Sequence, residues 1–187
     1  VDMLREGGIL AFITSQGVMD SSTGEPVREW LMNNANLVSA VRLPNNLFTD
    51  TAGTEVGSDL IVLQKQSGKT ALTPEEKLFL KSRTLSNGEK VNNYFQDFNR
   101  VVHTKGYVDK DLYGKPATIF IHEKGIEGIA SDLKGMLSAD FSQRLDTELY
   151  LNNSILRQPD YDYEMTKEDW QEMEEIMKAS KTKEFWA

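Results

Sequence analysis

A polar loop with one aromatic residue lies between two apolar segments, and its residue types could bind a flat ligand. The loop opens with Pro44, Asn45 and Asn46 and holds Phe48 near its centre. Asparagine carboxamides donate and accept hydrogen bonds, and a phenyl ring offers a face for stacking. The same residues also fit structural roles, because asparagine favours turns and a lone phenylalanine can plug the edge of a sheet. Taken alone, the pattern favours the structural roles.

Further polar residues lie at the ends of the neighbouring apolar segments. We expect five of them to form the rim of one cleft: Thr54, Glu55, Ser58, Ser15 and Gln16. This expectation rests on the rule that ligands in open α/β sheets bind at the edge where strands end. Arg42 could reach a phosphate at the same edge, although a single arginine is weak support for such a site.

Three short apolar segments are expected to form the sheet that positions these residues. They are ILAFITS at 9–15, LVSAVRL at 37–43 and SDLIVLQK at 58–65. The first segment follows a glycine and is continuously apolar, which is typical of a strand buried on both faces in a parallel sheet.

A helix is expected between the first two strands. Pro26 suits the first position of a helix, and three asparagines between 33 and 36 mark its end. Val27, Trp30 and Leu31 have the spacing of one helix face, which predicts that this face is buried. Residues 1–66 are therefore expected to form half of an α/β sandwich, and not a whole one.

Residues 67–187 are expected to form a mostly helical extension with one or two short strands. A helix begins near Thr73, where a capping threonine is followed by proline and two acids. A strand is expected at 117–123. Helical spacing follows in IEGIASDLKGML, where Ile126, Ile129, Ala130, Leu133 and Leu137 form the stripe, and another helix is expected near 139–150.

Two other parts of the extension have recognisable patterns. Tyr94, Phe95 and Phe98 are expected to share an apolar face. The pattern of residues 166–179 predicts an acidic amphipathic helix with a capping pattern at its start. This helix either packs on its own domain with a solvated outer face or provides a contact for a neighbouring domain.

The composition excludes several classes of site. The chain has 187 residues and no cysteine, so disulfides and cysteine-based zinc sites are excluded. His103 and His122 are the only histidines, and we interpret both as surface or packing residues and not as metal ligands. No apolar run approaches the roughly 18 residues of a membrane helix, and no signal segment is present, so we expect a cytoplasmic protein without membrane contact.

The net charge of -8 is distributed unevenly. Residues 1–65 carry 8 acids and 4 bases, residues 66–159 carry 12 and 13, and residues 160–187 carry 9 and 4. No stripe of lysine and arginine marks a surface for DNA. If nucleic acid is bound, most phosphate contacts are expected to come from elsewhere.

The chain opens in the middle of a pattern. VDMLREGG resembles the last turns of a helix that ends at a glycine. We therefore expect a fragment of a longer protein. Half a sheet leaves an unpaired apolar edge, so we also expect the fragment to self-associate by edge pairing or exchange of an element.

Three stretches together resemble a known family. They are GGILAFITSQGVMD, PVREWLMNNANLVSAVRLPNNLF and AGTEVGSDLIVLQK. They are similar to the back half of N6-adenine DNA methyltransferases, namely the modification subunits of type I restriction systems and the helicase–methylase fusion proteins of Bacteroides-like mobile elements. The resemblance is dense over residues 1–65. It continues more loosely, towards the fusion proteins alone, over NNYFQDFNRVV, YGKPATIFI and IEGIASDL.

The resemblance implies a fold and a role for the polar loop. The fold would be α/β, a partial Rossmann-like methyltransferase sheet with a mostly helical C-terminal extension. Residues 1–66 would be the C-terminal half of this methyltransferase-like domain. The three apolar segments would be the fifth, sixth and seventh strands, and the seventh would run antiparallel. Phe48 would stack on the extruded target adenine, and Pro44, Asn45, Asn46 and Thr54 would complete the substrate-binding loop.

The family's cofactor-binding and catalytic motifs do not occur in this sequence. A glycine-rich loop and an Asn/Asp-Pro-Pro-aromatic motif would bind S-adenosylmethionine and the target amine, and both precede the matching segments in family order. The chain is therefore expected to act on double-stranded DNA only with the upstream half of the methyltransferase. The alternative is a non-catalytic module of a helicase–methylase fusion protein, which docks the helicase or clamps DNA.

Overall fold

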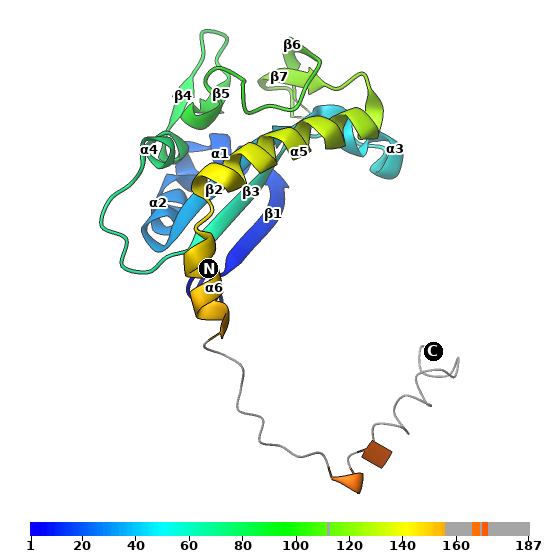
Figure 1. Ribbon diagram of the computed structural model, residues 1–187. Helices are drawn as coiled ribbons and strands as arrows, with labels where there is room; N and C mark the ends of the chain where they lie inside the picture. The colour runs from blue at the N-terminus through cyan, green and yellow to red at the C-terminus, as the bar shows by residue number, and fades with distance from the viewer. Residues whose placement is uncertain (112, 156–165, 169, 172–187) are drawn as a thin grey trace. The chain divides into compact units, whose positions relative to one another are not determined.

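The computed structural model describes residues 1–111, 113–155, 166–168 and 170–171, which contain both helices and strands (Figure 1). This confirms the predicted α/β class. The strands are β1 (Ile9–Ser15), β2 (Ala35–Leu43), β3 (Ser58–Lys65), β4 (Ser82–Thr84), β5 (Lys90–Asn92), β6 (Lys105–Lys110) and β7 (Pro116–Ile121). The α-helices are α1 (Gln16–Asp20), α2 (Glu25–Asn34), α3 (Thr49–Ala52), α4 (Pro74–Leu80), α5 (Gly125–Arg144) and α6 (Thr147–Ile155). Short 3-10 helices are η1 (Ser22–Gly24), η2 (Asn45–Phe48) and η3 (Asn93–Phe95).

The main sheet has the strand order β1-β3-β2. β3 is antiparallel to both neighbours, which confirms the antiparallel direction predicted for residues 58–65. Ser58, at the start of β3, is opposite Ser15 at the end of β1 and Leu43 at the end of β2. The loops that follow β1 and β2 and the loop that precedes β3 therefore meet at one edge of the sheet.

The two outer strands of this sheet differ in how they are covered. Beyond β2, the N–H of Arg42 donates to the carbonyl of Arg100 at 2.9 Å, and the N–H of Val102 donates to the carbonyl of Arg42 at 2.9 Å. Among the described residues, β1 pairs only with β3. Its residues alternate between exposed and half-buried, and Ile13 is 54% exposed. The prediction that this strand is buried on both faces is therefore wrong for the described chain, because nothing described covers its outer side.

Helix α2 buries a face that matches the predicted one only in part, because Leu31 is the one residue of the predicted three that packs against the core. It begins with Pro26 in its first turn, as expected, but Val27 and Trp30 are exposed, whereas Arg28 and Met32 are buried. The Arg28 guanidinium donates to the carbonyls of Val18, Ser21 and Leu80 at 2.9 Å each. Burial lowers the pKa of Arg28, and the charge of Asp20 partly offsets this shift. Arg28 can therefore occupy the buried face of α2, where an apolar residue is expected, because its guanidinium bonds to three backbone carbonyls.

Helix α4 starts where the sequence predicts, with a complete capping box. The Thr73 hydroxyl accepts from the N–H of Glu76 at 3.2 Å, and the Glu76 carboxylate accepts from the N–H of Thr73 at 2.9 Å. The same carboxylate accepts from the N–H of Leu37 at 3.0 Å. Glu76 therefore joins the start of α4 to the start of β2.

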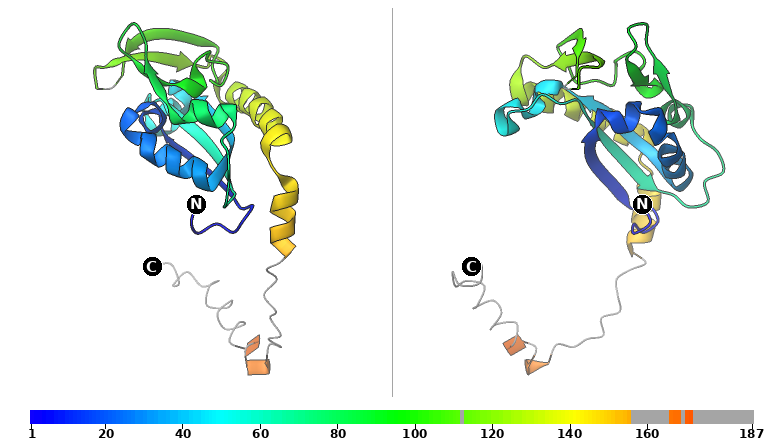
Figure 2. Two further views of the ribbon diagram at one scale, coloured as in Figure 1. Left: turned by 90° about the vertical axis from the view of Figure 1, so that its left-hand side faces the viewer. Right: turned by 180° about the vertical axis from the view of Figure 1, so that it is seen from behind.

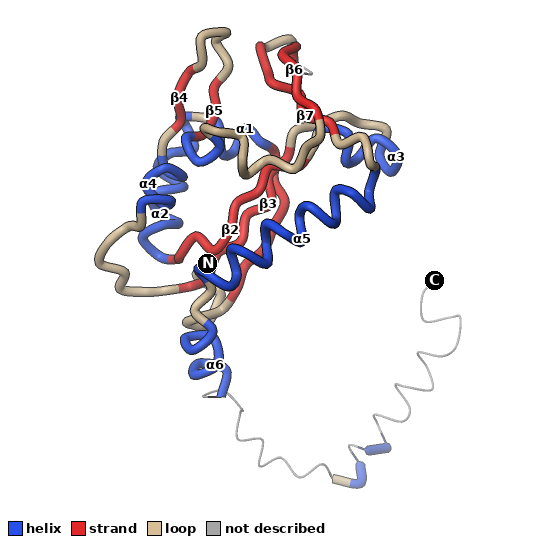
Figure 3. The backbone as a smooth tube through the Cα atoms, turned by 45° about the horizontal axis from the view of Figure 1, so that its top comes forward, coloured by secondary structure: helices blue, strands red, loops and turns tan. Residues whose placement is uncertain are grey.

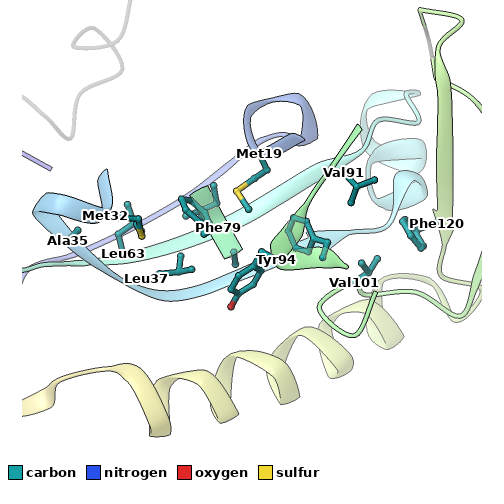
Figure 4. Close-up of a cluster of buried hydrophobic side chains, with 13 residues drawn as sticks. Met19, Met32, Ala35, Leu37, Leu63, Phe79, Val91, Tyr94, Val101 and Phe120 are labelled. Carbon is teal, nitrogen blue, oxygen red and sulfur yellow. The ribbon is translucent and has the colours of Figure 1, made fainter. Parts of the chain in front are cut away.

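One core cluster lies between the sheet and the helices α1, α2 and α4 (Figure 4). Tyr94 and Phe95 are buried in it, and Phe98 packs against it, so the predicted aromatic cluster is confirmed. The Tyr94 ring meets Phe79 and Phe95 edge-on, with ring centroids 6.5 and 5.7 Å away. Such edge-to-face pairs stabilise the packing beyond the area that they bury. Residues on both sides of position 66 contribute to this core.

Helix α5 covers the other side of the sheet (Figure 2). It is one continuous helix to Arg144. The further helix expected near 139–150 is present as α6, but it begins later, after Leu145 and Asp146. The packed face of α5 carries Ile129, Leu133, Met136 and Leu137, whereas Ile126 and Ala130 of the predicted stripe are exposed. Buried Asp140 accepts from the Ser39 hydroxyl of β2 at 2.6 Å and pairs with Arg100. A polar contact therefore fixes α5 on the sheet.

Residues Val1–Asn153 form one compact unit, and a second unit begins at Ser154. The acidic helix predicted at 166–179 lies outside the described residues, apart from 166–168 and 170–171. In the described part of the chain, no helix combines the length and the apolar character that a membrane span requires.

Candidate functional site

A cleft of about 930 Å³ opens where β1 and β2 end and β3 begins. Its floor comes from the end of β1 and from residues 55–58 before and at the start of β3. Its walls come from the turn between β4 and β5 and from the hairpin of β6 and β7. Figure 3 shows both hairpins on the same side of the main sheet, beyond the ends of its strands.

The structure brings most of the predicted rim residues together in this cleft. Ser15, Gln16, Glu55 and Ser58 line it, as does Asn45 of the polar loop. The residues predicted with them but placed outside the lining are Pro44, Asn46, Phe48 and Thr54. Pro44 is buried, and Phe48, in η2, is half-buried. The role of Phe48 in stacking therefore stays a prediction.

The two asparagines of the loop hold the β6–β7 hairpin in place. The Asn45 side-chain oxygen accepts from the N–H of Phe120 at 3.0 Å. The Asn46 carboxamide accepts from the N–H of His122 at 3.0 Å and donates to its carbonyl at 3.2 Å. The two asparagine side chains thus bond to backbone groups at the end of β7 that a neighbouring strand could otherwise bind. The preference of asparagine for turns does not predict this role.

Gln16 lies directly over a glycine at the floor of the cleft. Its N–H donates to the carbonyl of Gly57 at 3.0 Å, and its carboxamide occupies the space that a Cβ atom at position 57 would need. A side chain at this position would therefore displace Gln16 from the cleft. The neighbouring Ser58 hydroxyl is buried and has no hydrogen-bond partner within the described residues.

Arg42 lies below the cleft in a buried charge cluster and does not face solvent. It is 2% exposed and binds Asp59 through two hydrogen bonds of 2.8 and 3.1 Å and Asp20 through one of 2.9 Å. Its guanidinium carbon is 4.4 Å from the centre of the Phe95 ring. The prediction that Arg42 could reach a phosphate is therefore wrong, because the side chain is buried and is bound to two carboxylates inside the protein.

The charge cluster shifts the pKa values of Arg42 and Asp59. Burial alone would lower the pKa of Arg42, but Asp59 and Asp20 outweigh burial and raise it. Burial raises the pKa of Asp59, and Arg42 offsets this shift only in part. Asp20 also accepts from the N–H of Asn92 at 2.8 Å, so the cluster joins α1, β2, β3 and β5 beneath the cleft.

Sequence reasoning missed the β6 half of the hairpin wall, whereas the strand expected at 117–123 is present as β7. Tyr107 and Asp109 of β6 line the cleft, together with their partners Ile119 and Ala117 of β7. Glu89, after the β4–β5 turn, accepts from the N–H and the hydroxyl of Thr118 at 2.8 and 2.6 Å. The only available signal was the exposed tyrosine in KGYVDK, which has no clear apolar alternation.

The two histidines lie where their interpretation as packing residues places them. His103 packs edge-on against Phe120, with ring centroids 5.0 Å apart, and its Nδ1–H donates to the carbonyl of Val101 at 2.9 Å. His122 is 1% exposed, and its Nε2 lies 3.2 Å from the carboxylate of Asp132. Across the described ranges, no group of three or more histidine, aspartate or glutamate side chains could hold a metal ion.

Comparison with known proteins places the chain in a family. The sequence model described as N-6 DNA Methylase matches residues 1–131, from the first residue into α5. The chain belongs to the N-6 DNA methylase family. This confirms the resemblance seen in the sequence, and the match extends beyond β3 to include the β6–β7 hairpin of this N-6 DNA methylase.

The other comparisons add little to this assignment. A search of curated proteins finds no significant match. One similar solved structure is a modification subunit described as belonging to a type I restriction enzyme of Vibrio vulnificus YJ016. It shares 18% identity with the methylase chain, covers 63% of it and has a TM-score of 0.30, and the chain spans 26% of that protein. At so low a TM-score the likeness does not define the fold.

Proposed function

We propose that the chain is the C-terminal part of an S-adenosylmethionine-dependent DNA adenine N6-methyltransferase. In this proposal it supplies the side of the cleft that holds the target base. The observation that carries the proposal is the position of the cleft, at the edge where β1 and β2 end, in a chain of the N-6 DNA methylase family. Because DNA is the substrate, the same proposal puts the protein in the cytoplasm.

The chemistry of the cleft suits an uncharged base. An adenine inside a duplex cannot be methylated at N6, so it must leave the stack and enter a pocket. The cleft combines apolar surface from Ile13 and Ile119 with the carboxamides of Asn45 and Gln16. Such a mixture of flat apolar contact and a few hydrogen-bonding groups is typical of small-molecule sites.

The sheet supports a Rossmann-like methyltransferase domain that continues beyond β1. β3 lies between β1 and β2 and runs antiparallel to both, the direction that the resemblance implies for the seventh strand of the family. The residues that would bind S-adenosylmethionine are not present in this chain, whose sequence lacks the glycine-rich loop and the Asn/Asp-Pro-Pro-aromatic motif. We therefore assign cofactor binding and the target-amine contacts to a preceding region, and double-stranded DNA binding to the whole protein.

The coding sequence upstream of the Val1 codon tests this assignment. We expect it to encode a glycine-rich loop after a strand, and then Asn- or Asp-Pro-Pro-Tyr/Phe shortly before VDMLREGG. If that motif is missing or broken, the proposed activity fails. A DNA-clamping or helicase-docking role within a fusion protein would then be the better account. Binding of S-adenosylmethionine to the full-length protein separates the two directly, because only the methyltransferase needs it.

The open edge of β1 leads to a prediction about association. The isolated chain is expected to self-associate by pairing or exchanging this strand, because its backbone groups and Ile13 are unprotected. Ile13→Lys should shift the chain towards monomer in light scattering, since a charge on an edge strand opposes pairing. Val27→Lys on the exposed face of α2 is the matched control and should leave the association unchanged. A monodisperse wild-type monomer at high concentration would contradict the prediction.

A further inference from the structure

The outer edge of β7, which β6 leaves unpaired, is bound by side chains and not by another strand. Alternate N–H groups of a strand point to the same edge. On this edge the acceptors are three side-chain oxygens, at 2.8, 3.0 and 3.0 Å: Glu89 for the N–H of Thr118, Asn45 for that of Phe120 and Asn46 for that of His122. In the described part of the chain, β6 and β7 form a sheet of their own (Figure 3). The hairpin therefore meets the body of the protein without a backbone ladder.

The base of the hairpin is firmly anchored. Phe120 is 3% exposed, and its ring packs against the rings of Phe98 and His103, with centroids 5.2 and 5.0 Å away. His122, one residue past β7, is buried as well. Asn46 binds both the N–H and the carbonyl of His122. Buried rings and hydrogen bonds therefore fix this end of the hairpin to the body of the protein.

The outer part of the hairpin depends on one carboxylate. All six residues of β6 are exposed. The Glu89 carboxylate accepts from the N–H of Thr118 at 2.8 Å and from its hydroxyl at 2.6 Å. Among the described residues, no hydrogen bond joins β6 or the turn after it to a residue outside the hairpin. A segment with so few anchoring contacts opens locally at a low free energy.

Glu89 belongs to the opposite wall of the cleft. It follows the turn between β4 and β5, is 7% exposed and lines the cleft, as Tyr107 and Asp109 of β6 do. Its own position is fixed, because its N–H donates to the Asn87 side chain at 3.0 Å and its carbonyl accepts from the N–H of Leu85 at 2.8 Å. The bonds from Glu89 to the hairpin therefore link the two walls.

We propose that the β6–β7 hairpin is a lid over the cleft, which the Glu89 carboxylate holds shut and which opens about its base at Phe120 and His122. Breaking the bonds to Glu89 frees the wall that carries Tyr107 and Asp109, while the base stays in place. The inference rests on the proposed function only for what enters the cleft, a nucleotide of DNA. A lid of this kind controls how fast a substrate enters and leaves.

Hydrogen exchange of the chain, measured by mass spectrometry of peptic peptides, tests the lid. Glu89→Ala should speed exchange in β6 and at 116–119 by about tenfold or more, because hydrogen bonds to a charged acceptor are lost. Exchange at 120–123 should stay slow, since the base keeps its contacts. Thr118→Val removes only the hydroxyl bond and keeps the N–H bond to Glu89, so it should give a smaller increase in the same segments.

Lys90→Ala is the matched control. Lys90 follows Glu89 in the sequence, but its ammonium donates to the Ser22 hydroxyl at 3.1 Å and not to the hairpin. Its replacement should leave exchange in β6 unchanged. Unchanged exchange in β6 for both Glu89→Ala and Thr118→Val would overturn the inference. An equal increase in β1, β2 and β3 would also overturn it, because Glu89 would then stabilise the whole fold and not a lid.

Binding kinetics of the full-length protein give a second readout, which a static wall contact would not change. A short fluorescein-labelled oligodeoxynucleotide that contains adenine is mixed with the protein in a stopped-flow instrument. Glu89→Ala should raise the association and dissociation rate constants by similar factors, because it increases the population of the open lid. A change in dissociation alone is the usual result of losing a contact, and it would contradict the lid.

The exchange experiment needs no DNA, so its result is independent of the proposed function. The predicted exchange pattern without methyl transfer by the full-length protein would leave the lid standing and remove the proposed function. Methyl transfer without that pattern would leave the proposed function standing and remove the lid.

Discussion

Replacing Arg42 with alanine is expected to lower the free energy of unfolding by about 3–5 kcal/mol. The substitution leaves Asp59, which is fully buried, and Asp20 without the cation that neutralises them. It also removes the guanidinium that packs on Phe95. Breaking a buried ion pair on one side is costly because the remaining charge cannot regain its hydration. Urea unfolding followed by circular dichroism measures the change.

Two further variants show whether the loss of stability comes from the unpaired charges or from the loss of side-chain volume. Lys105→Ala removes an exposed cation from β6 and should change stability by less than about 0.5 kcal/mol. Arg42→Ala combined with Asp59→Asn should cost less than the sum of the single changes, because the second removes the charge that the first leaves unpaired. A loss below about 1 kcal/mol for Arg42→Ala alone would show that the cluster is solvated and not buried.

Alanine variants of Asn45 and Asn46 are expected to rank in opposite order in a stability assay and in a methyl-transfer assay. Asn46→Ala removes two hydrogen bonds to the backbone of His122, whereas Asn45→Ala removes one to Phe120. Asn46→Ala should therefore cause the larger loss of stability, within about 1–3 kcal/mol. Asn45→Ala should cause the larger loss of methyl transfer, about tenfold, because only Asn45 lines the cleft.

This crossed result is informative because each variant is the control for the other. Both asparagines lie in η2, both change to alanine, and both hold the same hairpin. If Asn46→Ala reduces methyl transfer as much as Asn45→Ala does, the asparagines act only by holding β7, and Asn45 has no contact with substrate. Unfolding by urea and transfer of a labelled methyl group to DNA by the full-length protein supply the two measurements.

The features that the sequence predicted well are those set by local rules. The capping box at Thr73 and Glu76 follows from residue type and spacing, and α4 begins there. The three apolar segments became β1, β2 and β3 because short β-branched and aliphatic runs bounded by loops favour strands. The polar residues at the ends of these strands gathered in one cleft for the same reason, since the topology brings those ends together.

The features that the sequence did not predict depend on contacts between distant segments. Arg28 is buried because it donates to the carbonyls of Val18, Ser21 and Leu80. A prediction from helical periodicity assigns arginine to the exposed face of a helix and therefore missed this burial. The burial of Arg42 in β2 was also not predicted, because its partners Asp59 and Asp20 are 17 and 22 residues away in the sequence. Tyr107 became part of the cleft through the register of a hairpin whose first strand carries little apolar pattern.

The most direct test of the central claim is methyl transfer by the protein that the complete reading frame encodes. The purified protein is incubated with S-adenosylmethionine and unmethylated double-stranded DNA, and the DNA is digested to nucleosides for mass spectrometry. The proposed function predicts N6-methyladenine that depends on the cofactor and falls about tenfold in Asn45→Ala. Methylated cytosine, or no methylated base although the protein binds both DNA and cofactor, would contradict the proposed function.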